Sequence, residues 1–334
     1  MRRGLSPIER VPRAARYAAG AVTLVGALFA LWPVRIPPIP PPAGDPPDYA
    51  GAAARAVAES LAPEPEIATV CVNTAFLHGR KTRKSFLLLH GLSNCPAQFV
   101  ELGRQLHARG HNVYIPRLPG HGFKNRLTPE YGGLDLRQLA GWLADSLEIA
   151  RGLGDEVTVV GLSVNGATAA WAGEERPDIA RTVVLAPFLV PAGVPQWVSG
   201  PLGTLFSRMP NLFIWWDSSL KQDIPGPPHA YPWFPTRVVG KFMALGARLL
   251  ARASSRPPAC KRFAFAVSDV DSAINIASAW NLADRFAKWE GVEVERLRFA
   301  ADENVPHDFI DPSQPNEKTS LVYPRLIDLI DPEK

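Results

Sequence analysis

Short apolar runs alternate with amphipathic stretches from residue 67 to the C-terminal end of the chain. Compact runs of β-branched and aliphatic residues predict buried strands, and apolar residues at helical spacing predict helices. Strands are expected at 67–77, 85–89, 112–115, 157–160, 182–186, 262–267 and 292–299. Helices are expected at 50–61, 97–108, 136–153, 165–173, 276–289 and 320–329. This alternation predicts an α/β fold with a mostly parallel central sheet and helices on both faces.

The N-terminal region has a different pattern. A basic segment at 1–16 precedes an uncharged run at 17–34, which is near the lower limit of the about 17–25 residues that span a bilayer. We therefore expect a transmembrane anchor, with the remaining chain on the exported side, in the periplasm or cell envelope. Secretion after signal cleavage is the alternative. It is less favoured because Phe29, Leu31 and Trp32 stand where a cleavage site needs small residues.

Prolines crowd residues 35–47, which predicts a stiff, extended linker outside the core. The globular domain is then expected to cover residues 48–334. Its apolar content of 46% and charged content of 20% are typical of a globular protein, and the formal net charge is only +4. No basic face with interleaved aromatic residues is evident, so nucleic acid is not an expected partner.

The three cysteines, Cys71, Cys95 and Cys260, do not have the spacing of a metal site. They are either buried thiols, or one pair is bridged. No metal or cofactor is expected.

The stretch around Ser163 carries the clearest chemical signal. The β-branched run at 157–160 ends at Gly161, and small residues that tolerate a helix follow Ser163 directly. This pattern predicts a strand, a very tight turn and a helix, with Ser163 raised at the apex as a nucleophile. Asn165 stands where the usual G-x-S-x-G pattern has its second glycine, and Asn tolerates unusual backbone angles. An ordinary turn between strand and helix is the alternative.

Two further motifs follow expected strands. After the apolar run at 86–89 come His90 and Gly91, and the next backbone N–H is placed to stabilise a developing oxyanion together with that of Val164. His90 itself is expected to support the loop. The segment 116–122 is rich in Pro and Gly and predicts a rigid turn.

A serine hydroxyl needs a base to take its proton and an acid to orient that base. His307 is the one histidine after the last expected strand. Asp269 and Asp271 both follow the strand expected before them, and either one could instead cap or turn the loop. Asp271 is the preferred orienting acid, and Asp269 remains open. Asp308 is too close in sequence to His307 for that role.

These motifs occur in the order Ser, Asp, His, and the sequence resembles the α/β-hydrolases. It is most similar to bacterial serine esterases of the carboxylesterase, monoacylglycerol-lipase and lysophospholipase group, over about residues 67–330. Asn165 and Ser268 depart from positions where that group often has glycine. The resemblance implies Ser163 as nucleophile, His307 as base, Asp271 as orienting acid, and the backbones of Leu92 and Val164 as the oxyanion hole.

The resemblance also implies the function. It predicts a serine hydrolase that cleaves carboxylic esters through an acyl-enzyme, with a small-molecule ester or lipid-like molecule as substrate. A catalytically silent envelope binding protein and an amidase or peptidase with the same triad are the alternatives. The interruption at 190–258 lies where the group often inserts a cap. It carries large aromatic residues that are candidates for binding an apolar group, namely Trp197, Phe206, Phe213, Trp215, Trp216, Tyr231, Trp233 and Phe234.

Overall fold

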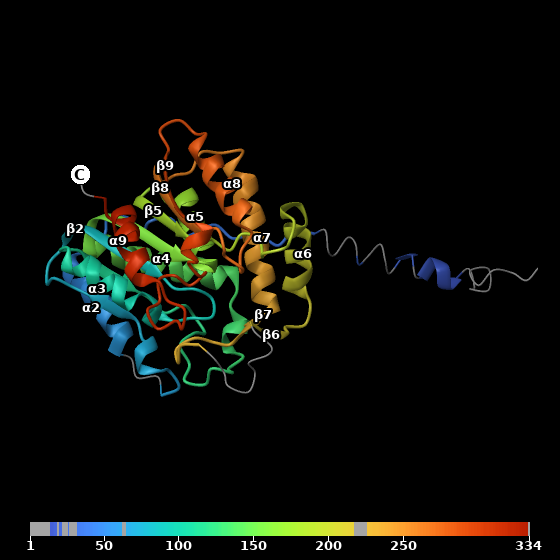
Figure 1. Cartoon of the computed structure of the whole chain (residues 1–334), viewed down its shortest axis with the longest axis horizontal. Helices are drawn as coiled ribbons and strands as arrows, with labels where there is room; N and C mark the ends of the chain where they lie inside the picture. The colour runs from blue at the N-terminus through green and yellow to red at the C-terminus, as the bar shows by residue number, and fades with distance from the viewer. Residues whose placement is uncertain are drawn as a thin grey trace, which may run out of the picture.

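The computed structural model describes residues 14–18, 20–21, 26, 32–61, 65–216 and 226–332. A seven-stranded sheet forms its centre (Figure 1). Neighbouring strands are parallel except for the first pair, β1 with β3. In spatial order the strands are β1 (Thr74–Phe76), β3 (Asn112–Ile115), β2 (Thr82–Leu89), β4 (Gly154–Leu162), β5 (Ile179–Leu185), β8 (Arg262–Ser268) and β9 (Glu293–Phe299).

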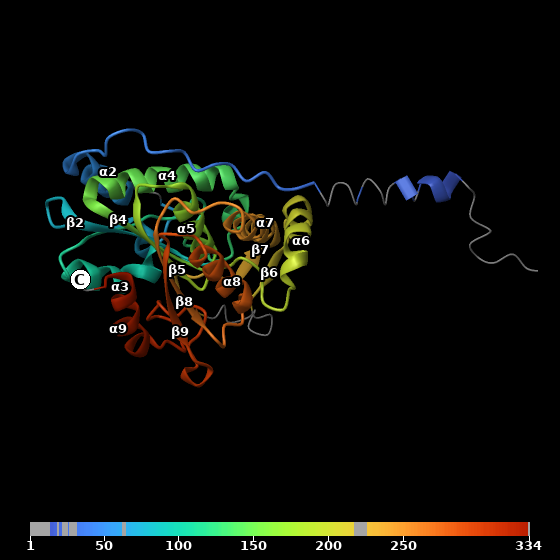
Figure 2. The ribbon, with the colours of Figure 1, turned by 90° about the horizontal axis from the view of Figure 1, so that it is seen from above.

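Helices cover both faces of this sheet. Figure 2 shows α4 on one face and α3 and α9 on the other. The bounds are α2 (Tyr49–Leu61), α3 (Val100–Ala108), α4 (Leu136–Leu153), α5 (Val164–Glu175), α8 (Ile276–Ala287) and α9 (Thr319–Ile330). The predicted α/β architecture is confirmed, and its cause is visible in the sequence. The apolar runs of β2, β4, β5 and β8 are buried on both sides, as a covered parallel sheet requires.

The expected strand at 67–77 is largely wrong. Only Thr74–Phe76 forms a strand, and a short 3-10 helix at Thr69–Cys71 precedes it. The reason is a disulfide between Cys71 and Cys95, whose Cα atoms are 5.2 Å apart. This cross-link holds residue 71 beside the loop that follows β2, away from the sheet. Cys260 is a buried free thiol.

The expected cap at 190–258 contains structure that the sequence pattern did not indicate. It holds α6 (Gln196–Arg208), a two-stranded sheet of β6 (Phe213–Trp215) and β7 (Trp233–Pro235), and α7 (Thr236–Ala253). One side of α7 belongs to the main core, where Phe242 and Leu245 are buried and Gly246 lies against the backbone of Leu189. Helix α6 and the small sheet pack on this core through partly buried side chains, such as Leu202, Phe206 and Phe213.

The proline-rich segment at 35–47 is extended, but it is not a free linker. Ile39 is 4% exposed and belongs to the main core. Its N–H donates to Glu175 Oε2 at 2.8 Å, and Arg176 Nη1 donates to the Pro40 carbonyl at 2.8 Å. The folded domain therefore begins before residue 48. We call the packed, extended segment at 33–47 the strap.

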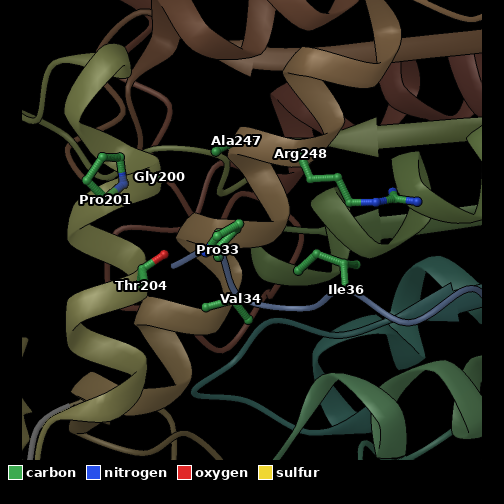
Figure 3. A pocket seen from close by; sticks show the side chains of 9 residues that line it. Pro33, Val34, Ile36, Gly200, Pro201, Thr204, Ala247 and Arg248 are labelled. Atoms are coloured by element: carbon green, nitrogen blue, oxygen red, sulfur yellow. The ribbon is translucent and has the colours of Figure 1, made fainter. Parts of the chain in front are cut away.

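The strap begins at α6 and α7. Figure 3 shows Pro33, Val34 and Ile36 beside residues of these two helices, around a cavity of about 390 Å³. Most of the predicted anchor at 17–34 and of the basic segment at 1–16 falls outside the described residues. Within the described part of the chain, no helix has both the length and the apolar content to cross a membrane.

Truncating Ile39 tests whether the strap is part of the folded domain. We expect Ile39→Ala to lower the free energy of unfolding by about 2–5 kcal/mol, because a buried side chain leaves a cavity. Denaturant unfolding measures this change. Val70→Ala, at an exposed site, is the control and should change stability by less than about 0.5 kcal/mol. Equal effects of the two substitutions would contradict a packed strap.

Candidate functional site

Ser163 occupies a strained turn between β4 and α5. Its φ of 61° and ψ of −121° lie in a region that residues other than glycine rarely adopt. The backbone turns so sharply that a side chain at Gly161 would overlap the carbonyl of Asn165. The Ser163 N–H donates to Leu185 of the neighbouring strand at 2.9 Å, which fixes the turn against the sheet. This is the geometry of a nucleophile elbow.

The residue that departs from the glycine pattern has a structural role. The Asn165 side chain is buried, and its Nδ2 donates to the His90 carbonyl at 2.6 Å. Helix α5 is thereby joined to the loop that follows β2. The glycine one position later, Gly166, allows α5 to approach the backbone of Leu185 and Pro187, where a side chain would collide.

His307 and Asp271 form a direct pair. His307 Nδ1 lies 2.6 Å from Asp271 Oδ2, and the Asp271 side chain is fully buried. Its other oxygen, Oδ1, accepts from the N–H groups of Ala273 at 2.9 Å and Ile274 at 3.2 Å. The carboxylate is thus held by backbone on one side and by the imidazole on the other. With Nδ1 engaged by Asp271, Nε2 is the ring nitrogen left for other partners, and His307 lines the cavity that contains Ser163.

Asp269 has a different partner. Both of its carboxylate oxygens accept from Arg298 Nε, at 2.7 and 2.9 Å, in an exposed pair. The structure therefore brings Asp271, and not Asp269, to His307.

Burial would lower the pKa of His307, but the charge and hydrogen bond of Asp271, with a further contribution from Asp308, raise it above the ordinary value. A raised pKa is expected where a buried carboxylate stabilises the charged imidazolium. A base of this kind is neutral and able to accept a proton only above its raised pKa.

The loop after β2 is held by several polar contacts. The Gly91 N–H donates to Gln98 Oε1 at 2.8 Å, and His121 Nε2 lies 2.6 Å from the Leu92 carbonyl. Leu92 and Val164 both line one cavity with Ser163. Val164 is the first residue of α5, so its N–H has no acceptor within that helix. The two residues predicted for the oxyanion hole thus lie at the same cavity as Ser163.

His90 supports this loop from within the core. Leu118 N–H donates to His90 Nε2 at 3.0 Å, and His90 Nδ1 lies 2.9 Å from the Gly91 carbonyl. Burial, together with the neighbouring His121, lowers the pKa of His90 to about 3, so the ring is neutral. The contacts agree with the structural role expected for His90. Arg117 Nη1 donates to the His121 carbonyl at 2.9 Å, within the turn that the Pro/Gly pattern predicts.

The cavity has a volume of about 560 Å³, and Ser163 and His307 both line it. One side is apolar, with aromatic and aliphatic side chains from the cap and from the loop after β5. These are Phe188, Trp215, Trp216, Tyr231 and Val239. Of the aromatic residues expected to bind an apolar group, Trp215, Trp216 and Tyr231 line the cavity, whereas Trp197 is exposed. Phe213 and Trp233 pack against each other in the small sheet.

Asp308 also lines the cavity, although sequence reasoning assigned it no role at the site. Its Oδ2 accepts from Asn94 Nδ2 at 3.2 Å and from Gln314 Nε2 at 2.6 Å, which joins the loop after β2 to the loop after His307. Burial, followed by the charge of Asp311, raises the pKa of Asp308 to about 6. A carboxylate next to the predicted base was the only signal for it in the sequence.

The cap is fastened to the same loops. The Tyr231 N–H donates to the Ser93 carbonyl at 2.7 Å, and His229 Nε2 lies 2.9 Å from Asp311 Oδ2 in a buried pair. The roof of the cavity is thus tied to both the loop after β2 and the His307 loop. In the part of the chain that the structure describes, no group of three or more His, Cys, Asp or Glu is placed to hold a metal ion.

The pairing of His307 is directly measurable. We expect Asp271→Asn to lower the pKa of His307, because the buried negative charge that favours the imidazolium is lost. NMR titration of the histidine ring protons, with His307→Gln to assign the resonance, measures the change. Asp269→Asn is the matched control and should leave that pKa unchanged. A larger effect of Asp269→Asn would show that Asp269 is the partner.

Comparison with known proteins identifies relatives of this chain. A pyrethroid hydrolase from Sphingobium wenxiniae is 30% identical over 118 residues, which are 34% of this chain and 39% of that protein. The chain therefore aligns with less than half the length of that relative.

Solved structures share the fold. A soluble variant of monoglyceride lipase from Saccharomyces cerevisiae superimposes with a TM-score of 0.58 at 14% identity, covering 78% of this chain and 91% of the lipase. A metagenome-derived lipolytic enzyme gives a TM-score of 0.55 at 19% identity, covering 79% and 98%. The sequence model of the α/β-hydrolase family matches residues 86–323, which is most of the chain. The chain belongs to the α/β-hydrolase family.

Proposed function

We propose that this protein is a serine hydrolase that cleaves carboxylic esters through an acyl-enzyme. The observation that carries the proposal is the combination of Ser163 on a strained elbow with His307 paired to the buried Asp271 beside the same cavity. A strained nucleophile turn and a desolvated acid–base pair both cost stability, and such features concentrate at sites that use them.

In the proposed reaction, Ser163 Oγ attacks the ester carbonyl carbon while His307 Nε2 takes the hydroxyl proton. The carbonyl oxygen becomes an oxyanion, which accepts hydrogen bonds from the N–H groups of Leu92 and Val164. Collapse of this intermediate breaks the ester C–O bond, and the imidazolium gives its proton to the departing alcohol. Water then attacks the acyl-enzyme, with His307 again acting as base, and releases the carboxylic acid. Asp271 orients the ring and stabilises its charged form.

The cavity supports a substrate with a bulky apolar part. Trp215, Trp216 and Phe188 offer a wide apolar surface beside Ser163. The partial likeness to a pyrethroid hydrolase and the shared fold with lipolytic enzymes favour hydrophobic esters, of which lipid-like esters are one class.

Two alternatives make different predictions. A silent binding protein would have no use for the strain at Ser163 or for the buried His307–Asp271 pair. An amidase with the same three residues would turn over anilides at least as readily as the matching esters, so a paired ester and anilide substrate distinguishes it.

We also propose that the run at 17–34 anchors the protein in a membrane, with the catalytic domain on the exported side. The arginines before the run support this orientation. The Cys71–Cys95 disulfide is a second support, because disulfides persist mainly in oxidising compartments outside the cytosol. Secretion after signal cleavage remains the alternative, and it fits the disulfide equally well.

Removing the proposed nucleophile tests the reaction. We expect Ser163→Ala to lower kcat on nitrophenyl esters by at least about 10³-fold, because the bond-forming oxygen is lost. Circular dichroism and thermal unfolding should show an intact fold. Ser93→Ala, at the same cavity, is the control and should retain activity within about tenfold of the unsubstituted chain. Near-normal turnover by folded Ser163→Ala would dismiss the proposal.

Membrane topology is tested on the full chain. We expect it to sediment with membranes and to resist extraction by alkaline carbonate, because an uncleaved apolar run remains in the bilayer. Protease added to spheroplasts should digest the domain. A mature N-terminus after Trp32 would instead establish signal cleavage, and protection from protease would contradict the proposed orientation.

A further inference from the structure

Helix α6 carries a line of apolar side chains on its outer surface. Trp197, Pro201, Leu205 and Met209 follow one another at intervals of four residues, from α6 to the residue just after it, and all four are exposed. This spacing places them along one side of the helix. Trp197 is 83% exposed, which is unusual for a side chain of this size.

The opposite side of α6 is small and partly polar. Ser199, Gly203 and Thr204 are its buried residues. Gly203 and Gly240 of α7 lie so close that a side chain on either one would collide with the backbone of the other helix. Leu202 and Phe206 of α6 are partly buried and pack against the core. The outer side of the helix also carries large apolar residues, among them Trp197 and Leu205. Burial of α6 against α7 does not explain the outward residues.

The short strand β6 and its flanks continue this surface. Leu212, Ile214 and Trp216 are exposed and alternate with the half-buried Phe213 and Trp215. Alternate residues of a strand point to opposite sides, so the outer side is again apolar. Half of the twelve large exposed apolar side chains in the described part of the chain fall between residues 197 and 216. We call these six residues the cap face; they are Trp197, Leu205, Met209, Leu212, Ile214 and Trp216.

Charge is almost absent here. The segment 187–216 contains no Asp, Glu or Lys, and Arg208 is its one charged residue. Large exposed apolar patches of this kind mark interaction sites. An uncharged patch with two exposed tryptophans suits a lipid surface, where tryptophan favours the interfacial region.

The position of the chain's N-terminal part identifies the partner. Pro33 and Val34 lie against α6 and α7, as Figure 3 shows, and they are the last two residues of the apolar run at 17–34. Figures 1 and 2 show α6 as the outermost helix of the domain, outside α7. The run thus joins the domain next to the cap face. We propose that the cap face lies on the surface of the lipid bilayer that holds the run.

This placement has a consequence for substrate entry. Trp216 belongs to the cap face and also lines the cavity that contains Ser163. A hydrophobic ester leaving the bilayer would therefore reach the cavity along apolar side chains without crossing water. The proposed contact with lipid rests on the proposed anchoring, which turns the cap face toward the bilayer. The route of substrate entry rests on the proposed ester hydrolysis.

Two leucines with nearly equal exposure allow a matched test. Leu205 on the cap face is 37% exposed, and Leu321 on α9 is 38% exposed. Each is replaced by cysteine in the full chain, labelled with a polarity-sensitive nitrobenzoxadiazole dye, and placed in phosphatidylcholine vesicles; the free Cys260 is buried. We expect the dye at position 205 to show a blue-shifted emission and slow reduction by dithionite, and the dye at 321 to behave as in water.

The outcomes separate the two proposals. A chain that floats with vesicles but shows the same emission at both positions would contradict the cap-face proposal and leave the anchor intact. A shift at 205 that grows with the protein-to-lipid ratio would identify a second copy of the chain as the partner and would also contradict it. Flotation that is lost in Leu205→Glu/Met209→Glu would support the cap face and contradict the anchor.

Rates of ester hydrolysis provide a second test of the cap face. Leu205→Glu/Met209→Glu should lower hydrolysis of a long-chain nitrophenyl ester carried in vesicles by about tenfold and leave hydrolysis of soluble nitrophenyl acetate unchanged. Leu321→Glu is the control and should change neither rate. Equal loss on both esters would show damage to the site and would contradict the proposed route of entry.

Discussion

The close approach of β4 and α5 at Ser163 is the constraint on which the rest of the site depends. A positive φ at a non-glycine residue persists only where the surrounding structure enforces it. Gly161 makes room for the Asn165 carbonyl, and the Ser163 N–H is held by Leu185 of the adjacent strand. The same turn sets the start of α5, and hence the position of the Val164 N–H. One piece of backbone therefore fixes both the proposed nucleophile, Ser163, and the proposed oxyanion donor, the Val164 N–H.

The loops around this turn are joined to one another by side-chain and backbone hydrogen bonds. Asn165 connects the elbow to the His90 loop, Asp308 connects that loop to the region after His307, and Tyr231 ties the cap to Ser93. The Cys71–Cys95 disulfide adds a covalent link at the outer side. Preorganisation of this kind places donors where charge develops, so that little rearrangement is needed during the reaction. The cap then supplies apolar surface on both of its sides, toward the cavity and toward the outside.

The sequence predicts the sheet, its helices and the positions of Ser163, Asp271 and His307 because these follow from local patterns at strand ends. It favoured Asp271 but left Asp269 open, because both follow the same strand and only the packed loop shows that Asp269 binds Arg298. The packing of Ile39 was missed because a proline-rich composition describes backbone stiffness and not what the strap contacts. The exposed apolar side of helix α6 was missed for a similar reason. Apolar periodicity alone does not tell which side of a helix is buried.

The account is tested most directly by trapping the covalent intermediate. The protein is mixed with a nitrophenyl ester, quenched in acid during turnover, digested and examined by mass spectrometry. We predict an acyl group on the peptide that contains Ser163, absent when the ester is omitted. An acyl group on another residue, or turnover with no acylated peptide at any time, would contradict the proposed role of the elbow at Ser163.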